Sequence, residues 1–281
     1  MKRITFIFTA FILFLFIAGG TGRVTAQQTF TERFTAHNRS MSSKQPSFIT
    51  PLVGADPRIV QYAKFSVAHQ YASTGTETVN YGNGRGTGII VGDRFEFDFI
   101  APPYIQHNSA ADDGFGDTAV LAKYRIASAN AEGGNYDIAF VLSHCFATGS
   151  HKNGASTDSF GPTLAAGYAF HRFDVISSMG GTLPTGKIST QGRAIAWNTI
   201  SQAHIKPHIW FEVENNATFF AGGSHDGKMQ NFVTPAAFYI IRGKKWKSTH
   251  PTYIIDGGMQ IATSGFYTYN HNLITELRML F

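Results

Sequence analysis

Residues 92–102, GDRFEFDFIAP, alternate between charged and phenylalanine side chains. Successive side chains of a β-strand point to opposite faces, so a strand here has one charged face and one apolar face. The charged face carries Arg94, Glu96 and Asp98, and the apolar face carries Phe95, Phe97 and Phe99. A soluble protein would bury the phenylalanines in its core, whereas a barrel in a membrane would turn them toward lipid.

Similar alternation recurs from residue 59 to the end of the chain. Short runs separated by turn-forming loops predict strands of about 9 to 11 residues or slightly more, the length that a tilted membrane strand needs. The predicted strands are 59–71, 87–100, 115–127, 136–147, 160–170, 173–183, 194–205, 208–220, 231–241, 252–263 and 270–281. Several of them oppose a charged face to an apolar one, as Glu212 and Glu214 do to Phe211 and Val213.

The composition favours the membrane alternative. Charged residues make up 15% of the chain, against about 25% in a typical soluble domain. The chain also contains 14% aromatic residues and 29 glycines, and no segment after the N-terminal apolar run reaches roughly 18 consecutive apolar residues. An exported β-sandwich or a lipocalin-like barrel would alternate as well, but with more surface charge and, for the lipocalin, fewer strands. The sequence therefore predicts an all-β, transmembrane, antiparallel up-and-down β-barrel.

Bacterial single-chain barrels have an even number of strands, whereas the pattern predicts an odd number. Residues 47–55, SFITPLVGA, are the best candidate for a further strand, so we predict 12 strands, with 10 as the alternative. The tight connections at 171–172 and 206–207 predict periplasmic turns at the end where the C-terminus lies. The predicted outward loops are 101–114, 148–159, 184–193, 221–230 and 264–269. Connections 72–86 and 242–251 are long for periplasmic turns, and the pattern does not explain them.

The N-terminus has the features of a secretory signal peptide. Lys2 and Arg3 precede an apolar run that is too short for a membrane span, and VTA at 24–26 resembles a cleavage site. We expect cleavage after residue 26; an uncleaved anchor is the alternative. Residues 27–58 are polar and irregular, which predicts a flexible N-terminal extension or a small plug in the barrel mouth. The barrel itself is predicted to span 59–281.

The charge balance gives no support for nucleic-acid binding. Removal of the leader takes away three basic residues and no acidic one, so 23 basic residues fall to 20 against 18 acidic ones and the net charge falls from +5 to +2. The remaining basic cluster, KKWK at 244–247, is typical of a solvated turn. Scattered histidines and the absence of a nucleotide motif predict neither a metal site nor a cofactor.

Four stretches carry a family resemblance. They are GFGDTAVLAKYRI (114–126), FATGSHKNGASTDSFGPTLAAGYAF (146–170), GGTLPTGK (180–187) and LITELRMLF (273–281). Together they resemble a family of bacterial outer-membrane barrels named for the meta-pathway of phenol degradation, over residues 90 to 281. The resemblance implies a transporter-like barrel that passes hydrophobic or aromatic compounds. It supplies no catalytic residues and does not reach residues 27–58.

The last strand resembles the C-terminal signal that the barrel-assembly machinery reads in outer-membrane proteins. Apolar residues stand at alternate positions and the chain ends on an aromatic residue. The residues of this candidate signal are Leu273, Leu277, Met279 and Phe281. The expected partners are therefore this machinery, outer-membrane lipids and a small-molecule solute.

A passive channel in the outer membrane is the leading functional hypothesis, because charged side chains on the inward face tune which solutes pass. The candidate lumen-lining residues are Arg94, Glu96, Asp98, Asp117, Lys123, Arg125, Glu212 and Glu214. These charges would instead fill the lumen if they paired across strands, which would suit a closed structural or adhesive barrel.

An outer-membrane lipid hydrolase is the weakest hypothesis. Ser143 and His144 are strand neighbours that point to opposite faces. Ser224, His225 and Asp226 lie in a predicted loop and are typical of turn chemistry. We therefore expect no enzyme.

Overall fold

The computed structural model describes residues 30–243 and 251–281. The predicted leader at 1–26 and the basic cluster at 244–247 lie outside these residues. Within them, no helix combines the length and the apolar character that crossing a membrane requires.

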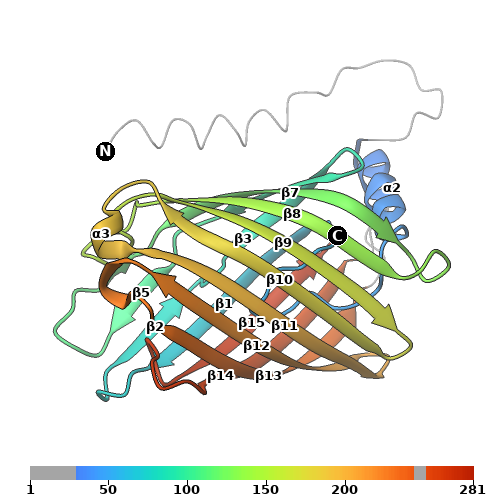
Figure 1. Ribbon diagram of the computed structural model, residues 1–281. Helices are drawn as coiled ribbons and strands as arrows, with labels where there is room; N and C mark the ends of the chain where they lie inside the picture. The colour runs from blue at the N-terminus through green and yellow to red at the C-terminus, as the bar shows by residue number, and fades with distance from the viewer. Residues whose placement is uncertain (1–29, 244–250) are drawn as a thin grey trace.

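The main body is a closed antiparallel β-barrel (Figure 1). The elements in chain order are α2 (Phe30–Ser42), β1 (Tyr62–Tyr71), β2 (Glu77–Tyr81), β3 (Gly86–Val91), β4 (Phe95–Ile100), β5 (Tyr104–His107), β6 (Gly114–Phe115), β7 (Thr118–Ala129), β8 (Tyr136–Phe146), β9 (Ser159–Phe170), β10 (Phe173–Pro184), α3 (Ile188–Gln191), β11 (Arg193–Lys206), β12 (Ile209–Ala221), η1 (Gly223–His225), β13 (Met229–Arg242), β14 (Thr252–Ala262) and β15 (His271–Leu280). β1 pairs with β15, from Tyr62 opposite Leu280 to Tyr71 opposite His271, and this pairing closes the barrel.

The barrel has twelve strands, as predicted, because three of them are interrupted. β2 and β3 both pair with β1 and together form the second strand. β4 and β5 pair with β3 and β2 to form the third, and β6 and β7 pair with β5 and β4 to form the fourth. The remaining strands, β8 to β15, follow one another as simple hairpins.

The predicted position of the twelfth strand was wrong. Residues 47–55 form no strand, and the predicted single strand 87–100 is the β3–β4 hairpin. The hairpin was missed because Asp93 and Arg94 in its turn continue the alternation of the strand that follows. Gly92 begins this turn at φ 63°, a left-handed conformation that glycine adopts without steric cost.

This extra strand also explains the long connection that the pattern predicted at 72–86. Most of it belongs to β2 and to the start of β3, and only 72–76 connect β1 to β2. β1 therefore runs in the opposite direction to the one predicted, and the 72–76 connection lies with the longer loops.

The two barrel ends differ. The tight turns at 171–172 and 207–208, the C-terminus and α2 lie at one end, called here the inner end. The longer loops, such as 147–158 and 185–192, lie at the opposite, outer end. α2 rests on the inner end through Thr35, Asn38 and Met41, which share one buried face of the helix. Met41 packs against Ile59 and against Ile90 of β3.

The barrel is apolar outside and polar or filled inside. Phe95 and Phe97 face outward and are 44% and 49% exposed, whereas Glu96 between them is 0% exposed. Large apolar side chains face outward on the other strands too, including Phe65, Leu164, Val175, Phe211, Val213 and Leu277. A continuous apolar exterior suits a hydrocarbon environment. The phenylalanine face of 92–102 is therefore the outside of the protein.

Candidate functional site: the occupied barrel interior

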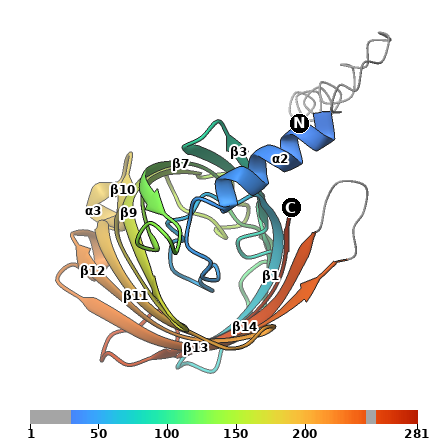
Figure 2. The ribbon, with the colours of Figure 1, turned by 90° about the vertical axis from the view of Figure 1, so that its right-hand side faces the viewer.

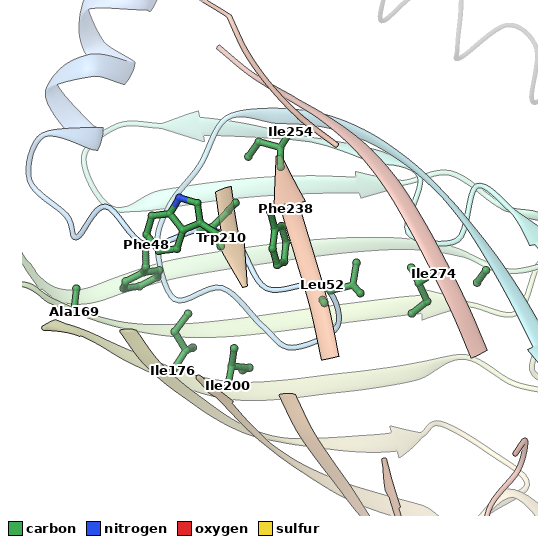
Figure 3. Close-up of a cluster of buried hydrophobic side chains, with 12 residues drawn as sticks. Phe48, Leu52, Ala169, Ile176, Ile200, Trp210, Phe238, Ile254 and Ile274 are labelled. Atoms are coloured by element: carbon green, nitrogen blue, oxygen red, sulfur yellow. The ribbon is translucent and has the colours of Figure 1, made fainter. Parts of the chain in front are cut away.

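The hydrophobic core lies inside the barrel because the chain before β1 enters it. Residues 43–61, called here the plug, connect α2 to β1 and pass inside the ring of strands (Figure 2). Phe48, Ile49 and Leu52 of the plug pack against apolar side chains of the wall (Figure 3). These wall residues are Ala68, Ala169, Ile176, Ile200, Trp210, Ala236, Phe238, Ile254 and Ile274. The segment 27–58 was predicted as a flexible extension, with a small plug in the barrel mouth as the alternative and a strand at 47–55; its residues 43–58 supply the centre of the molecule.

The plug is a loop closed by its own hydrogen bonds. Gln45 donates from Nε2 to the Ile59 carbonyl at 2.8 Å and accepts from the Ile59 backbone N–H at 3.0 Å. This amide replaces a backbone pairing and fixes the two ends of residues 46–58 side by side. A compact loop with close ends is the arrangement seen in Ω-loops.

Arg58 organises the inside of this loop. Its guanidinium donates to the Phe48 carbonyl, lies 2.7 Å from the Asp56 carboxylate and stands 4.5 Å from the centre of the Phe48 ring. Thr50 donates to Asp56 at 2.6 Å. Burial disfavours the charged form of Asp56, but the Arg58 guanidinium, the Lys123 ammonium and the Thr50 hydroxyl together outweigh this and hold the pKa of the carboxyl below its usual value. The ion pair is therefore charged and rigidifies the loop.

Wall carboxylates bind the backbone N–H groups of the plug. Glu214 accepts from Val53 at 2.7 Å and from Gly54 at 2.9 Å. Glu212, two residues earlier on the same face of β12, accepts from Leu52 at 3.1 Å. The plug has no strand partner at these positions, and a buried N–H without an acceptor is costly. The two carboxylates take the place of a neighbouring strand.

Gln202 of β11 adds further hydrogen bonds between the wall and the plug. It accepts from the Ile49 N–H at 3.2 Å, donates to the Ile49 carbonyl at 2.8 Å and donates to Glu212 at 2.7 Å. The same amide thus pairs with both backbone groups of Ile49 and orients the Glu212 carboxylate, which binds the Leu52 N–H.

Wall cations bind carbonyl groups of the plug. Arg278 of β15 donates to the Thr50 carbonyl at 2.6 Å and to the Pro51 carbonyl at 3.0 Å. Its charge is balanced by Glu276, which it also contacts, and by Asp256 at 3.2 Å. All three side chains are buried. Arg278 therefore joins two buried carboxylates to the plug backbone.

Lys123 of β7 makes a similar contact on the other side of the plug. Its ammonium lies 2.8 Å from the Arg58 carbonyl and 2.9 Å from the Glu96 carboxylate. Glu96 also accepts from the Val60 N–H. The plug is thus held by opposite charges on β4 and β7, by charges on β12 and β15, and by the Gln202 amide on β11.

Glycine makes room for the plug in the wall. A Cβ at Gly167 of β9 would lie 2.7 Å from Phe48 and 3.2 Å from Pro57. A Cβ at Gly258 of β14 would lie 2.8 Å from Leu52, but also 2.6 Å from the Pro235 carbonyl of β13, so the neighbouring strand needs this glycine too. At Gly167 the short contacts are with plug residues, so a side chain there requires the plug to move and the wall is shaped to its occupant.

Six of the eight predicted lumen-lining candidates are buried inside the barrel. They are Glu96, Asp98, Lys123, Arg125, Glu212 and Glu214. Four of these six bind the plug directly, as described above, and Arg125 donates to Gln45 of the plug at 3.3 Å. Whether any of them contacts a solute stays a prediction.

The other two candidates are placed elsewhere, contrary to the prediction. Arg94 lies exposed in the β3–β4 turn, 3.3 Å from the Tyr124 hydroxyl, because β4 begins one residue later. Asp117 lies at the outer end between β6 and β7. It accepts from the Gly149 and Ala155 N–H groups at 2.9 and 2.6 Å and so holds the 147–158 loop.

Sequence reasoning missed Arg278 and Gln202 as site residues. Both stand on inward positions of strands that were correctly predicted, so strand alternation alone could have identified them. The plug could not be found in this way, because its residues follow no strand or helix period.

The interior changes beyond the plug. From Asn198 and Asn216 toward the outer end, a region called here the outer half, amides and hydroxyls form inward hydrogen bonds beside apolar side chains such as Phe232. Asn216 donates to Asn198 at 3.1 Å, and Thr234 donates to Asn216 at 3.0 Å. Asn272 donates to Gln260 at 2.9 Å. The outer half thus contains neutral polar side chains that bind mostly to one another.

Two cavities remain beside the plug. One of about 450 Å³ lies at the inner end between α2, the plug and the wall. A smaller one of about 140 Å³ lies between the plug and the charged side chains of β1, β4 and β7.

The candidate hydrolase residues do not assemble. Among the described residues, no hydrogen bond joins Ser143 to His144 or Ser224 to His225. Ser143 donates to the Gly161 carbonyl at 3.3 Å, while His144 stacks on Phe160 on the barrel exterior. The described residues also contain no group of three or more His, Cys, Asp or Glu side chains that could hold a metal ion.

The fold is similar to that of known outer-membrane channels. It matches the NanC porin with a TM-score of 0.50 and 10% sequence identity over 77% of this chain and 98% of that one. It matches an outer membrane channel from Pseudomonas putida F1 with a TM-score of 0.51 and 13% identity over 83% of this chain and all of that one. No protein-family model matches the sequence, and no curated protein does. The chain therefore has the fold of porin-like outer-membrane channels, and its resemblance to the phenol meta-pathway family stays a prediction.

Proposed function

We propose that this chain is an outer-membrane channel for small solutes whose lumen is closed by its own plug and opens when the plug is displaced. The observation that carries the proposal is the nature of the plug contacts. The wall binds the plug through side-chain hydrogen bonds and packing, and no strand pairing joins the plug to the barrel. Such contacts can be broken while every barrel strand keeps its partners.

The likeness to solved channels supports a channel function at the level of the fold. Passage of hydrophobic or aromatic compounds rests on the family resemblance alone. Export by a cleaved leader and assembly through Leu273, Leu277, Met279 and Phe281 complete the proposal. Leu273, Leu277 and Phe281 are exposed on the barrel, where an assembly factor could reach them.

A closed structural barrel is the second candidate, and the apolar cluster inside the lumen favours it. An interior filled by Phe48, Leu52 and their wall partners has no need to open. The two functions differ in one observable property, which is whether the plug leaves the lumen.

A reversible disulfide between the plug and the wall distinguishes the gated channel from the closed structural barrel. A Cβ placed at Gly54 lies 3.3 Å from Cγ1 of Ile200, within the reach of a disulfide. The test protein carries Gly54→Cys and Ile200→Cys, with Cys145→Ser to remove the native thiol. Its conductance is measured in a planar bilayer before and after reduction.

A gated channel predicts openings in the reduced protein that are absent in the oxidised protein. The two single-cysteine variants serve as controls, because reduction should leave their conductance unchanged. No conductance in either redox state, together with no conductance after deletion of residues 30–61 from a correctly folded barrel, would establish the structural function instead.

A further inference from the structure

The larger cavity at the inner end has the size of a small-molecule site. Its volume of about 450 Å³ falls in the range of roughly 300 to 1,000 Å³ that is usual for such sites. Three separate parts of the chain surround it: α2, the plug and the barrel wall. Trp210, Ile254 and Leu280 line it from the wall, and Phe48 and Ile49 line it from the plug.

Two buried amides in this lining lack hydrogen-bond partners. Gln61, at the end of the plug, is 3% exposed, and neither its Nε2 nor its Oε1 has a partner. Asn38 of α2 is 5% exposed, and its Oδ1 has none, although its Nδ2 donates to the Phe281 carbonyl at 3.3 Å. Buried polar groups are rarely left without partners, and those that are call for an explanation. A ligand in the cavity would supply these partners.

The unpartnered atoms define the chemistry of that ligand. They comprise one N–H donor group, on Gln61, and two carbonyl acceptors, on Gln61 and Asn38. Their complement is one acceptor together with two N–H donors, which a primary carboxamide or a urea group supplies. The rest of the lining is largely apolar, so the body of the ligand is an apolar ring system.

We propose that the inner-end cavity binds a small neutral molecule that carries a primary carboxamide or urea group on an apolar ring. The polar group pairs with Gln61 and Asn38, and the ring packs against Trp210 and Ile254. Arg39 and Arg58 also line the cavity. A carboxylate in place of the carboxamide is therefore the comparison that matters most.

The site has a consequence for the plug. A molecule in this cavity contacts the plug on one side and the wall on the other. Because it binds only when both are in place, it stabilises the docked plug. The binding site is independent of conduction, whereas its effect on opening rests on the proposed channel function.

The test uses the full mature chain in detergent and three probes: naphthalene-2-carboxamide, naphthalene-2-carboxylate and naphthalene. Isothermal titration calorimetry, with detergent-only titrations subtracted, measures each affinity. The carboxamide is expected to bind about tenfold more tightly than either comparison probe. Equal affinities for all three probes, or heat explained by partition into detergent alone, would overturn the proposal.

Substitution of Gln61 locates the site. Gln61→Leu keeps the size of the side chain and removes its hydrogen bonds, so carboxamide affinity should fall about tenfold. Gln106→Leu, at an exposed position of the outer end, is the matched control and should leave the affinity unchanged. An unchanged affinity in Gln61→Leu would contradict the assignment. If Gln61→Leu fails to fold, Ile240→Trp, which fills the cavity from β13, must abolish binding in its place.

These outcomes are separable from those of the channel test. The disulfide between positions 54 and 200 does not touch Gln61 or Asn38. Redox-dependent conductance without carboxamide binding would support the channel function and contradict the proposed binding site. Carboxamide binding without redox-dependent conductance would support the binding site and contradict the channel function.

Discussion

The inner half of the barrel interior carries charged side chains that bind the plug backbone, whereas the polar side chains of the outer half are amides and hydroxyls that bind one another. Glu214 and Asn216 lie two residues apart on the same face of β12 and show the change. Glu214 accepts from two plug N–H groups, and Asn216 donates to Asn198 and to Glu214 itself. Charge is therefore concentrated where an unpaired chain segment needs partners.

The comparison also shows what the buried charges do. A buried charge is costly unless opposite charges and hydrogen bonds compensate it. Arg278, Lys123 and their carboxylate partners meet this requirement partly with plug carbonyl and N–H groups. The plug and the charges thus stabilise each other, and removal of either leaves polar groups of the other without some of their partners.

Substitution of Arg278 is expected to cause the largest loss of stability. Arg278→Met removes the cation that contacts both Asp256 and Glu276, leaves Lys64 at 3.6 Å as the remaining cation beside Glu276, and leaves two plug carbonyls without a donor. The free energy of unfolding should fall by about 3–5 kcal/mol, measured by urea titration in lipid vesicles. Arg242→Met, at an exposed position of β13, is the matched control and should change it by less than about 0.5 kcal/mol. Equal losses of stability at positions 278 and 242 would contradict the claim that the buried charges are stabilised together with the plug.

Glu214 should show the next largest effect, and it should be confined to the plug. Glu214→Ala leaves the N–H groups of Val53 and Gly54 without acceptors, at a cost of about 1–3 kcal/mol each. Limited proteolysis of the folded barrel should then cleave within residues 43–61. Asn272→Ala, in the outer half, removes only a bond to Gln260, and the plug should stay resistant. Cleavage of the plug in both variants would show that the two halves do not act separately.

A smaller effect is expected from the fit between plug and wall. Gly167→Ala places a methyl group against Phe48 and Pro57, and overpacking of this kind costs about 1–3 kcal/mol. Gly265→Ala, in an outer loop with open space around its Cβ, is the control. Thermal unfolding followed by circular dichroism compares the two. A stability loss at 265 that matches the loss at 167 would argue against a wall shaped to the plug.

Asp117 should have the smallest effect, although its chemistry resembles that of Glu214. Asp117→Ala removes the acceptor for two N–H groups of the outer 147–158 loop, at a cost of about 1 kcal/mol because the site is only half-buried. Hydrogen exchange should speed up in that loop and stay unchanged in the plug. Faster exchange in the plug would mean that the outer loops and the plug are coupled.

Strand alternation predicted the fold and much of the interior. It placed Phe95 and Phe97 outside and Glu96, Glu212 and Glu214 inside, because side-chain direction in a strand depends only on residue parity. It failed at the β3–β4 turn, where Asp93 and Arg94 continue the period of the strand. Parity says nothing of where a turn falls within a continuing alternation.

The pattern offered a plug in the barrel mouth and charges paired across the lumen only as alternatives, and it could not predict which groups the interior charges bind. Glu212, Glu214 and Arg278 bind backbone groups of the plug. Nearly every residue has the same backbone groups, so the sequence does not indicate which of them are bound. The plug itself has only scattered apolar residues, of which Phe48 and Leu52 become core residues once the barrel encloses them. Long-range enclosure of this kind is set by the closed sheet and not by local propensity.

The central claim is that the plug is docked in the lumen and held there by the wall. Hydrogen exchange at the backbone amides of Leu52, Val53 and Gly54, in the wild-type protein in lipid, tests it most directly. The claim predicts exchange as slow as that of the barrel strands, because these amides are bonded to Glu212 and Glu214. Exchange as fast as that of the exposed 108–112 loop would contradict it.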